Sequence, residues 1–291
     1  MKKKPCHELV MGMTGSGKTV FSRGALLPAY QEVYPTVIVD TKHDKNDELW
    51  NYADVTVNSV KAMIKYLEKG WHVHYRVKDN GWKSRWAQFD TICKAIARME
   101  GGIVTYVNEG GDVMTNIKMP EWFEAMLRKG RSPQHFAIVE TQRPSLIVHP
   151  NLFNNTESFW MFRLGQKDRD AIRKWFDDDG LDEVANMEKF SFLWTDGYES
   201  SVSPPIDLEV LEHGKRRNEE REPRPSDGIW DSIGVFGTQG AISDAVSKSR
   251  RRKGAGGRGA GSVQEVSVRI GDAPARDTRG AEGTSSGTRK A

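Results

Sequence analysis

A glycine-rich segment near the start of the chain has the residue types and the spacing needed to hold a polyphosphate. It comprises Gly12, Met13, Thr14, Gly15, Ser16, Gly17, Lys18 and Thr19. The glycines let backbone N–H groups turn toward phosphate oxygens, the lysine brings a positive charge to the β- and γ-phosphates, and the Thr19 hydroxyl can ligate Mg²⁺. A mostly apolar run precedes the segment and a helix can begin within it, as a P-loop requires. We therefore predict ATP and Mg²⁺ as cofactors.

A carboxylate follows a second apolar run, 103–107, where a nucleotide-hydrolysing site needs one. Ligands of open parallel sheets bind at the carboxyl ends of the strands, so Glu109 could orient the water that attacks the γ-phosphate or accept its proton. The position before it is usually Asp in such motifs and is Asn108 here. An asparagine can hydrogen-bond a metal-bound water but contributes no charge. We predict that Glu109 is catalytic and that Asn108 contributes to the metal site. The alternative for Glu109 is an acidic residue in a solvated loop.

Two more polar residues end predicted strands. Gln142 follows the run 136–141, and an amide at that position can sense the γ-phosphate or hold the attacking water. Its alternative is to cap the turn before Pro144. Asp40 ends the run 36–40 and could supply the charge that Asn108 lacks. Its alternative is an ion pair within the following loop.

Four arginines are candidates for stabilising negative charge in the transition state, because a guanidinium is a fixed, always charged fork. They are Arg128, Arg131, Arg143 and Arg163. Arg131 is the first choice as a catalytic residue, since its loop can point away from its own strand edge and reach a neighbouring subunit. Arg163 is the second choice. For any one of the four, a surface arginine is the alternative interpretation.

These residues must be positioned by an alternation of short β-branched or aromatic runs with longer amphipathic stretches. The predicted strands are 8–11, 36–40, 73–77, 103–108, 136–141, 158–164 and 190–195. The predicted helices are 18–27, 59–69, 85–99, 121–129, 168–176 and 181–187. Such alternation is typical of an α/β fold with a mostly parallel central sheet flanked by helices.

Composition divides the 291 residues into two parts. Residues 213–291 hold 16 basic and 10 acidic residues and half of the 28 glycines, whereas residues 1–212 carry a net charge of −3. We predict a folded domain over 1–212 and a flexible, basic Gly/Arg/Ser-rich tail over 213–291, which either contacts a polyanion or only aids solubility. Two distant cysteines argue against a disulfide framework. We expect no signal peptide and no membrane span, because no apolar run of about 18 residues occurs.

Taken in order, these motifs resemble the FtsK/HerA superfamily of DNA-pumping ATPases. The most specific stretch is Thr141–Ser145, Thr-Gln-Arg-Pro-Ser, followed by Asn154 and by Phe162-Arg163. The resemblance covers residues 8 to about 197. It implies a RecA-like P-loop NTPase fold, nucleotide and Mg²⁺ binding by Lys18 and Thr19, Glu109 as the catalytic acid, Gln142 as the sensor, and an arginine acting in trans.

A chain of this size in that superfamily is similar to the genome-packaging ATPases of membrane-containing viruses. The resemblance implies a homo-oligomeric ring, expected to be a hexamer, that pumps double-stranded DNA into a preformed capsid. Capsid or membrane vertex proteins would be further partners, in the host cytoplasm or on the virion. Asn108 departs from the family pattern and puts metal handling in doubt. The alternatives are a filamentous-phage assembly (Zot-like) ATPase, a plasmid conjugation or mobilisation motor, and a non-hydrolysing nucleotide-dependent scaffold.

Overall fold

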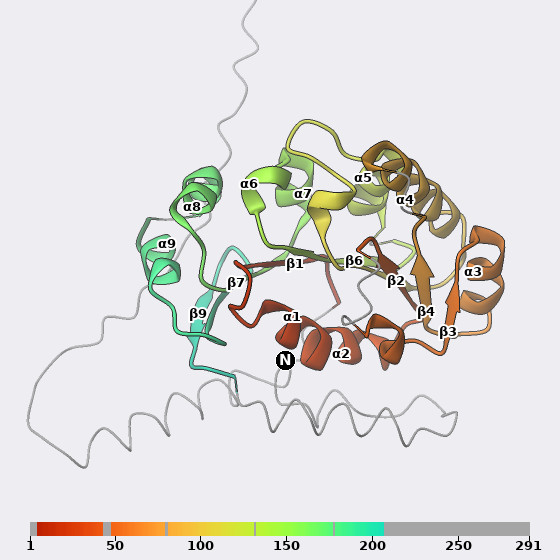
Figure 1. The fold of residues 1–291 in the computed structure, drawn as a ribbon, viewed down its shortest axis with the longest axis horizontal. Coiled ribbons are helices and arrows are strands. Elements are labelled where there is room, and N and C mark those ends of the chain that lie inside the picture. The colour runs from red at the N-terminus through yellow and green to blue at the C-terminus, as the bar shows by residue number, and fades with distance from the viewer. Residues whose placement is uncertain (1–4, 43–47, 79–80, 131, 177, 207–291) are drawn as a thin grey trace, which may run out of the picture.

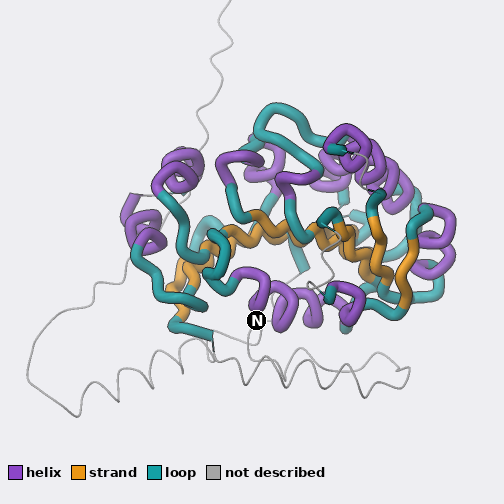
Figure 2. Tube along the Cα trace, viewed as in Figure 1, coloured by secondary structure: helices purple, strands orange, loops and turns teal. Residues whose placement is uncertain are grey.

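Helices cover both faces of a nine-stranded sheet in the computed structural model, which describes residues 5–42, 48–78, 81–130, 132–176 and 178–206 (Figure 1, Figure 2). The strands are β1 (Glu8–Met11), β2 (Thr36–Asp40), β3 (Val55–Val57), β4 (Val73–Arg76), β5 (Ile103–Val107), β6 (His135–Thr141), β7 (Ser158–Met161), β8 (Phe192–Thr195) and β9 (Ser200–Ser203). Their order across the sheet is β3-β4-β2-β5-β6-β1-β7-β8-β9. Neighbours from β3 to β7 are parallel, and β8 runs antiparallel to β7 and β9. The predicted mostly parallel sheet is confirmed.

The helices fall on two sides of this sheet. They are α1 (Lys18–Phe21), α2 (Leu27–Gln31), α3 (Val60–Leu67), α4 (Trp82–Ile96), α5 (Glu121–Lys129), α6 (Pro144–Ile147), α7 (Pro150–Asn155), α8 (Gln166–Ile172) and α9 (Asp178–Ala185). Helices α1 and α2 lie along one face, and the others lie on the opposite face or at its end (Figure 1). Short helical turns cover Ser22–Leu26, Leu49–Tyr52, Gly110–Asp112 and Arg173–Trp175.

Two hydrophobic clusters pack the sheet, one on each face. Successive strand residues point to opposite faces, so Leu9 and Met11 join the cluster under α3 to α9 while Val10 joins the cluster under α1 and α2. In β6, Phe136 and Ile138 face α1 and α2. This alternation places residue 140, two positions further, beneath the start of α1.

Most predicted elements are confirmed, with differences at their ends. Helix α5 and strands β1 and β2 have the predicted bounds. The predicted strand 158–164 ends at Met161, where the chain turns so that the Arg163 carbonyl accepts a 3.0 Å hydrogen bond from the Met13 N–H. The predicted helix 18–27 extends to Gln31 through a wide π turn over Ser22–Leu26. Elements β3, β9, α6 and α7 were not predicted from the residue pattern.

The predicted tail lies outside the described residues, which end at position 206. Within the described ranges, no helix combines the length and the apolarity needed to cross a bilayer. Cys6 and Cys93 are both buried.

Candidate nucleotide-binding site

The P-loop, residues 12–19, connects the end of β1 to the start of α1, as its sequence predicts. Gly17 has φ 106° and Gly15 has φ 77°, backbone values that residues with a Cβ rarely adopt. A Cβ at Gly17 would also lie 2.5 Å from Cδ1 of Phe190. The Gly12 N–H donates to the Thr141 carbonyl at 3.2 Å, and Phe190 N–H donates to the Ser16 carbonyl at 2.8 Å. The loop is therefore held from β6 and from the segment before β8.

Lys18 and Thr19 both contact the carboxylate of Glu140, a residue of β6. Lys18 is buried and its Nζ lies 3.3 Å from Glu140 Oε2. The Thr19 hydroxyl donates to the same oxygen at 3.0 Å. Sequence reasoning did not single out Glu140 as a site residue. The signal that could have found it is a carboxylate in phase with the apolar residues Phe136 and Ile138, which predicts a buried charge.

The other carboxylate oxygen of Glu140, Oε1, accepts hydrogen bonds from Ser22 Oγ and Tyr106 OH. Burial by itself would raise the pKa of Glu140, but the charges of Lys18 and Arg23 and these two hydrogen bonds outweigh it, and the pKa is lowered. Burial and the Glu140 charge raise the pKa of Tyr106 well above its usual value. A charged carboxylate and a protonated tyrosine therefore lie under the P-loop.

The three motifs predicted from the sequence meet at the carboxyl ends of β1, β6 and β5. Thr14 Oγ1 donates to Gln142 Oε1 at 3.0 Å. Glu109 Oε1 accepts from Thr141 Oγ1 at 3.1 Å and from the Gln142 N–H at 3.4 Å. Lys42 Nζ lies 3.6 Å from Glu109 Oε2. A continuous chain of contacts thus joins the P-loop, the predicted sensor and the predicted catalytic acid.

Asn108 and Asp40 are placed toward β2 and β4. The Asn108 Oδ1 accepts from the Thr41 N–H at 3.3 Å and lies 3.1 Å from Thr41 Oγ1. Asn108 Nδ2 is buried and has no hydrogen-bond partner among the described residues. Asp40 Oδ2 lies 3.2 Å from His74 Nε2. Asp40 therefore has a local hydrogen-bond partner, and its strand β2 lies two strands away from β6.

The candidate arginines lie in different environments. Arg131 falls outside the described residues. Arg163 is exposed and adjoins the P-loop through its carbonyl, which accepts from Met13 N–H. Arg128 is exposed and pairs with Glu124 at 3.7 Å on α5, and Arg143 is exposed beside Gln142. The assignment of an arginine to a neighbouring subunit's site stays a prediction.

The oxygen groups at the P-loop fit a magnesium ion that arrives with a nucleotide. Mg²⁺ prefers hard oxygen ligands, keeps several waters, and uses one or two protein groups together with phosphates. Thr19 offers a hydroxyl oxygen, with the Glu140 carboxylate directly behind it. Over the described ranges, no group of three or more His, Cys, Asp and Glu residues could hold a metal by itself. The residues present therefore fit Mg²⁺ bound mainly through phosphate and water.

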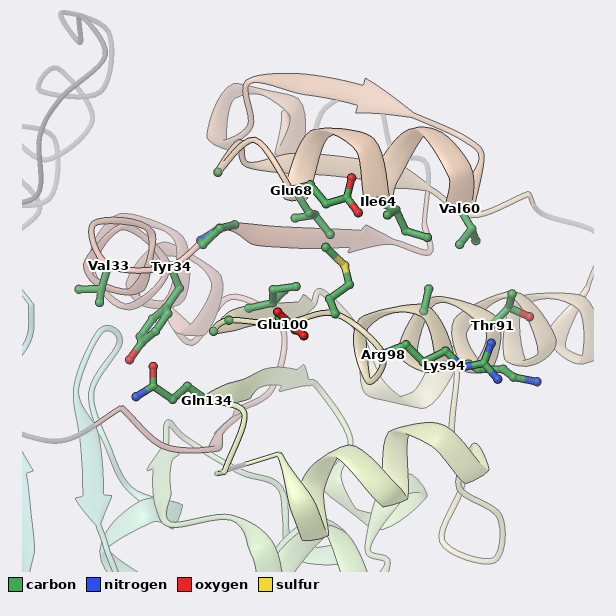
Figure 3. A pocket seen from close by; sticks show the side chains of 18 residues that line it. Val33, Tyr34, Val60, Ile64, Glu68, Thr91, Lys94, Arg98, Glu100 and Gln134 are labelled. Carbon is green, nitrogen blue, oxygen red and sulfur yellow. The ribbon is translucent and has the colours of Figure 1, made fainter.

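A separate hollow of about 1030 Å³ lies near the amino-terminal ends of β2 and β5, away from the P-loop edge (Figure 3). Glu68, which follows α3, and Lys94 of α4 contribute to its lining, together with Tyr34, Arg98 and Gln134. It shares no lining residue with the P-loop. The hollow therefore lies at the opposite ends of the strands from the P-loop.

Solved structures share this fold. The genome packaging NTPase B204 from Sulfolobus turreted icosahedral virus 2, in complex with AMPPCP, matches with a TM-score of 0.55 and 17% identity over 69% of this chain and 98% of that one. B204 from Sulfolobus turreted icosahedral virus, described as a DNA-packaging ATPase, matches with a TM-score of 0.55 and 16% identity over 70% of this chain and 100% of that one. VirB4 of Thermoanaerobacter pseudethanolicus matches with a TM-score of 0.54 and 10% identity over 71% and 90%. No protein-family profile and no curated protein matches by sequence.

Proposed function

We propose that this chain is an ATP-driven DNA translocase of the FtsK/HerA superfamily that pumps a double-stranded viral genome into a preformed capsid. The observation that carries the proposal is the chain of contacts from Thr14 through Gln142 to Glu109. It links the phosphate loop, a γ-phosphate sensor and a water-activating acid across three neighbouring parallel strands. The fold shared with B204, an NTPase of genome packaging, supports the same reaction.

Each residue has a distinct task in this reaction. Lys18 and the backbone N–H groups at the start of α1 bind the phosphates, since the first N–H groups of a helix have no partner within it. Mg²⁺, when bound, neutralises phosphate charge, and Thr19 would hold it. Glu109 orients the attacking water or accepts its proton. Gln142 contacts both the loop and Glu109, so its position can report whether the γ-phosphate is present.

The partners follow from the same proposal. Double-stranded DNA is the substrate that is moved, and copies of this chain form a ring, a hexamer, in which an arginine of one subunit reaches the nucleotide of the next. Arg131 and Arg163 remain the candidates for that residue. The basic segment Lys248–Lys253 gives the tail an electrostatic affinity for a polyanion. Capsid or vertex proteins complete the assembly, in the host cytoplasm or on the virion.

A conjugation motor is the second candidate, and the fold shared with VirB4 is the observation that favours it. A filamentous-phage assembly ATPase uses the same P-loop chemistry. Asn108, which brings no charge to the metal side, favours a non-hydrolysing scaffold instead. Turnover measurements separate the scaffold from the motors, and a capsid-protein gene beside this one would favour packaging over conjugation.

The direct test is ATP hydrolysis by the full chain with and without double-stranded DNA. We expect turnover that DNA accelerates, and a loss of about 10²- to 10³-fold in kcat for Glu109→Gln, because the amide cannot accept a proton. Glu121→Gln, an exposed substitution in the first turn of α5, is the matched control and should keep the parent's rate. Absence of turnover under both conditions would exclude the motor. Turnover that DNA leaves unchanged, in a protein whose mass is that of a monomer, would exclude translocation.

A further inference from the structure

We propose that Glu140 is a positioning residue of the Mg²⁺–nucleotide site, which holds the Thr19 hydroxyl and the Lys18 ammonium and supplies from β6 the negative charge that Asn108 does not supply from β5. The inference rests on the proposed function, because it requires a magnesium nucleotide at the P-loop. It gives a role to a residue that the P-loop, the acid and the sensor leave unused.

The position of Glu140 follows from the sheet order. Strand β6 lies between β5, which carries Asn108 beyond its end, and β1, which leads into the P-loop. Glu140 is level with Val10 in the β1–β6 register. Its side chain lies on the face covered by α1, where it is fully buried. The Glu140 carboxylate therefore contacts Lys18 and Thr19 from the side of the sheet.

The contacts of Glu140 determine how Thr19 can act. An ionised carboxylate only accepts hydrogen bonds, and a hydroxyl has one proton to give. Thr19 therefore donates that proton to Glu140 Oε2 at 3.0 Å. Its oxygen accepts from Lys18 Nζ at 3.3 Å, which leaves its second lone pair for a metal. Lys18 Nζ, also 3.3 Å from Glu140 Oε2, is held beside Thr19. Both P-loop side chains that handle phosphate and metal thus share one anchor.

The groups around the Glu140 carboxylate stabilise its charged form. Ser22 and Tyr106 donate to its second oxygen, and Lys18 and Arg23 provide positive charge nearby. Buried charges persist in proteins when they are paired and hydrogen-bonded in this way. Glu140 thus places a negative charge next to the Thr19 hydroxyl, whereas Asn108 is neutral and supplies none.

Two neighbouring polar residues, Asn108 and Asp40, form their hydrogen bonds with residues outside the P-loop. The Asn108 carbonyl oxygen accepts from Thr41, and the Asp40 carboxylate lies against His74. Neither of these contacts reaches Lys18 or Thr19. Among the described residues, Glu140 is the carboxylate that contacts both of them.

The experiment compares the affinity of the full chain for a fluorescent ADP analogue with saturating Mg²⁺ and with EDTA. The ratio of the two dissociation constants measures how much the metal strengthens nucleotide binding, and it needs no turnover. We expect Glu140→Gln to reduce this ratio about 10- to 100-fold, the usual effect of losing a residue that orients a metal ligand. Adding Asn108→Asp to Glu140→Gln should restore most of the ratio, because it returns the charge from β5.

Glu8→Gln is the matched control for folding. Glu8 is also a buried carboxylate of the central strands; it accepts from Tyr30 OH and from Trp160 Nε1, both at 2.8 Å. Its substitution should lower the melting temperature without changing the Mg²⁺ ratio. If Glu140→Gln does not fold, Glu140→Asp keeps the charge and withdraws it from Thr19, and should reduce the ratio as well.

The outcomes separate this inference from the proposed function. A parent chain that binds no nucleotide would remove the proposed function itself. A parent that binds with a clear Mg²⁺ enhancement, together with a folded Glu140 variant that keeps the same enhancement, would overturn the inference alone. If the double variant folds and its Mg²⁺ ratio is no higher than that of Glu140→Gln, a charge at position 108 does not replace the charge at position 140. That result would overturn this part of the inference.

Discussion

Glu140 shows how a single buried charge connects stability with nucleotide chemistry. Its two oxygens accept from Lys18, Thr19, Ser22 and Tyr106, so its ionisation is tied to the shape of the P-loop. Removing one partner of a buried ion pair is strongly destabilising, because the other charge stays buried and unpaired. The same residue therefore affects both folding and metal binding, which is why the Mg²⁺ ratio and the melting temperature must be measured separately.

The pH dependence of stability provides a test at this residue. The folded-state pKa of Glu140 is lowered, below an unfolded value of about 4.3. Its ionisation therefore contributes stability that is fully present above the unfolded pKa and is lost as the pH falls through the folded pKa. We expect the free energy of unfolding of the parent to fall more steeply than that of Glu140→Gln as the pH drops below about 5. Urea unfolding at constant ionic strength measures both profiles; parallel profiles would contradict a lowered pKa.

The P-loop is an element whose conformation depends on what packs against it. Gly17, the residue before α1, has φ 106°, and Phe190, itself at φ 69°, lies directly against it. Behind them, Phe21, Trp160 and Phe192 form a group of aromatic rings with centroids 4.7–5.2 Å apart. The loop thus depends on a segment about 170 residues away in the chain.

Two glycines of the loop give a matched prediction. Gly15→Ala meets no atom within 4 Å but adopts a positive φ, so it should cost about 1–2 kcal/mol of unfolding free energy. Gly17→Ala has the same backbone strain and places Cβ 3.0 Å from Cα of Phe190, a backbone atom that cannot rotate away. Because of this overpacking, we expect Gly17→Ala to lose about 1–3 kcal/mol more unfolding free energy than Gly15→Ala. Urea unfolding of both variants checks the order, and equal losses would show that Phe190 does not pack on the loop in solution.

The elements differ in how far the sequence determines them. Long amphipathic stretches such as α5 and apolar runs such as β2 were predictable, because their patterns are local. Gln142 and Glu109 were predictable as residues at strand ends, but their contact through Thr141 depends on β6 lying between β5 and β1. Glu140 was missed because its role depends on α1 crossing above it. The alternation of β6 predicts that the Glu140 carboxylate is buried, but no local pattern predicts its contacts with Lys18 and Thr19.

At the scale of the whole molecule, the sheet order concentrates the chemistry at one edge. The carboxyl ends of β5, β6 and β1 lie side by side, and β7 beyond them directs Arg163 toward the start of the P-loop. The hollow of Figure 3 lies near the amino-terminal ends of β2 and β5 and takes no part in this arrangement. The proposed nucleotide site therefore occupies one edge of the described domain.

We propose that this chain converts ATP hydrolysis into movement along double-stranded DNA. The most direct measurement is the displacement of a third strand from a linear duplex by the full chain, with ATP, with a non-hydrolysable analogue, and with the Lys18→Ala variant. We predict that the parent displaces the third strand with ATP, at a rate that rises with ATP concentration. We predict no displacement with the non-hydrolysable analogue or by Lys18→Ala. Hydrolysis of ATP without displacement, on duplexes to which the protein demonstrably binds, would contradict the account.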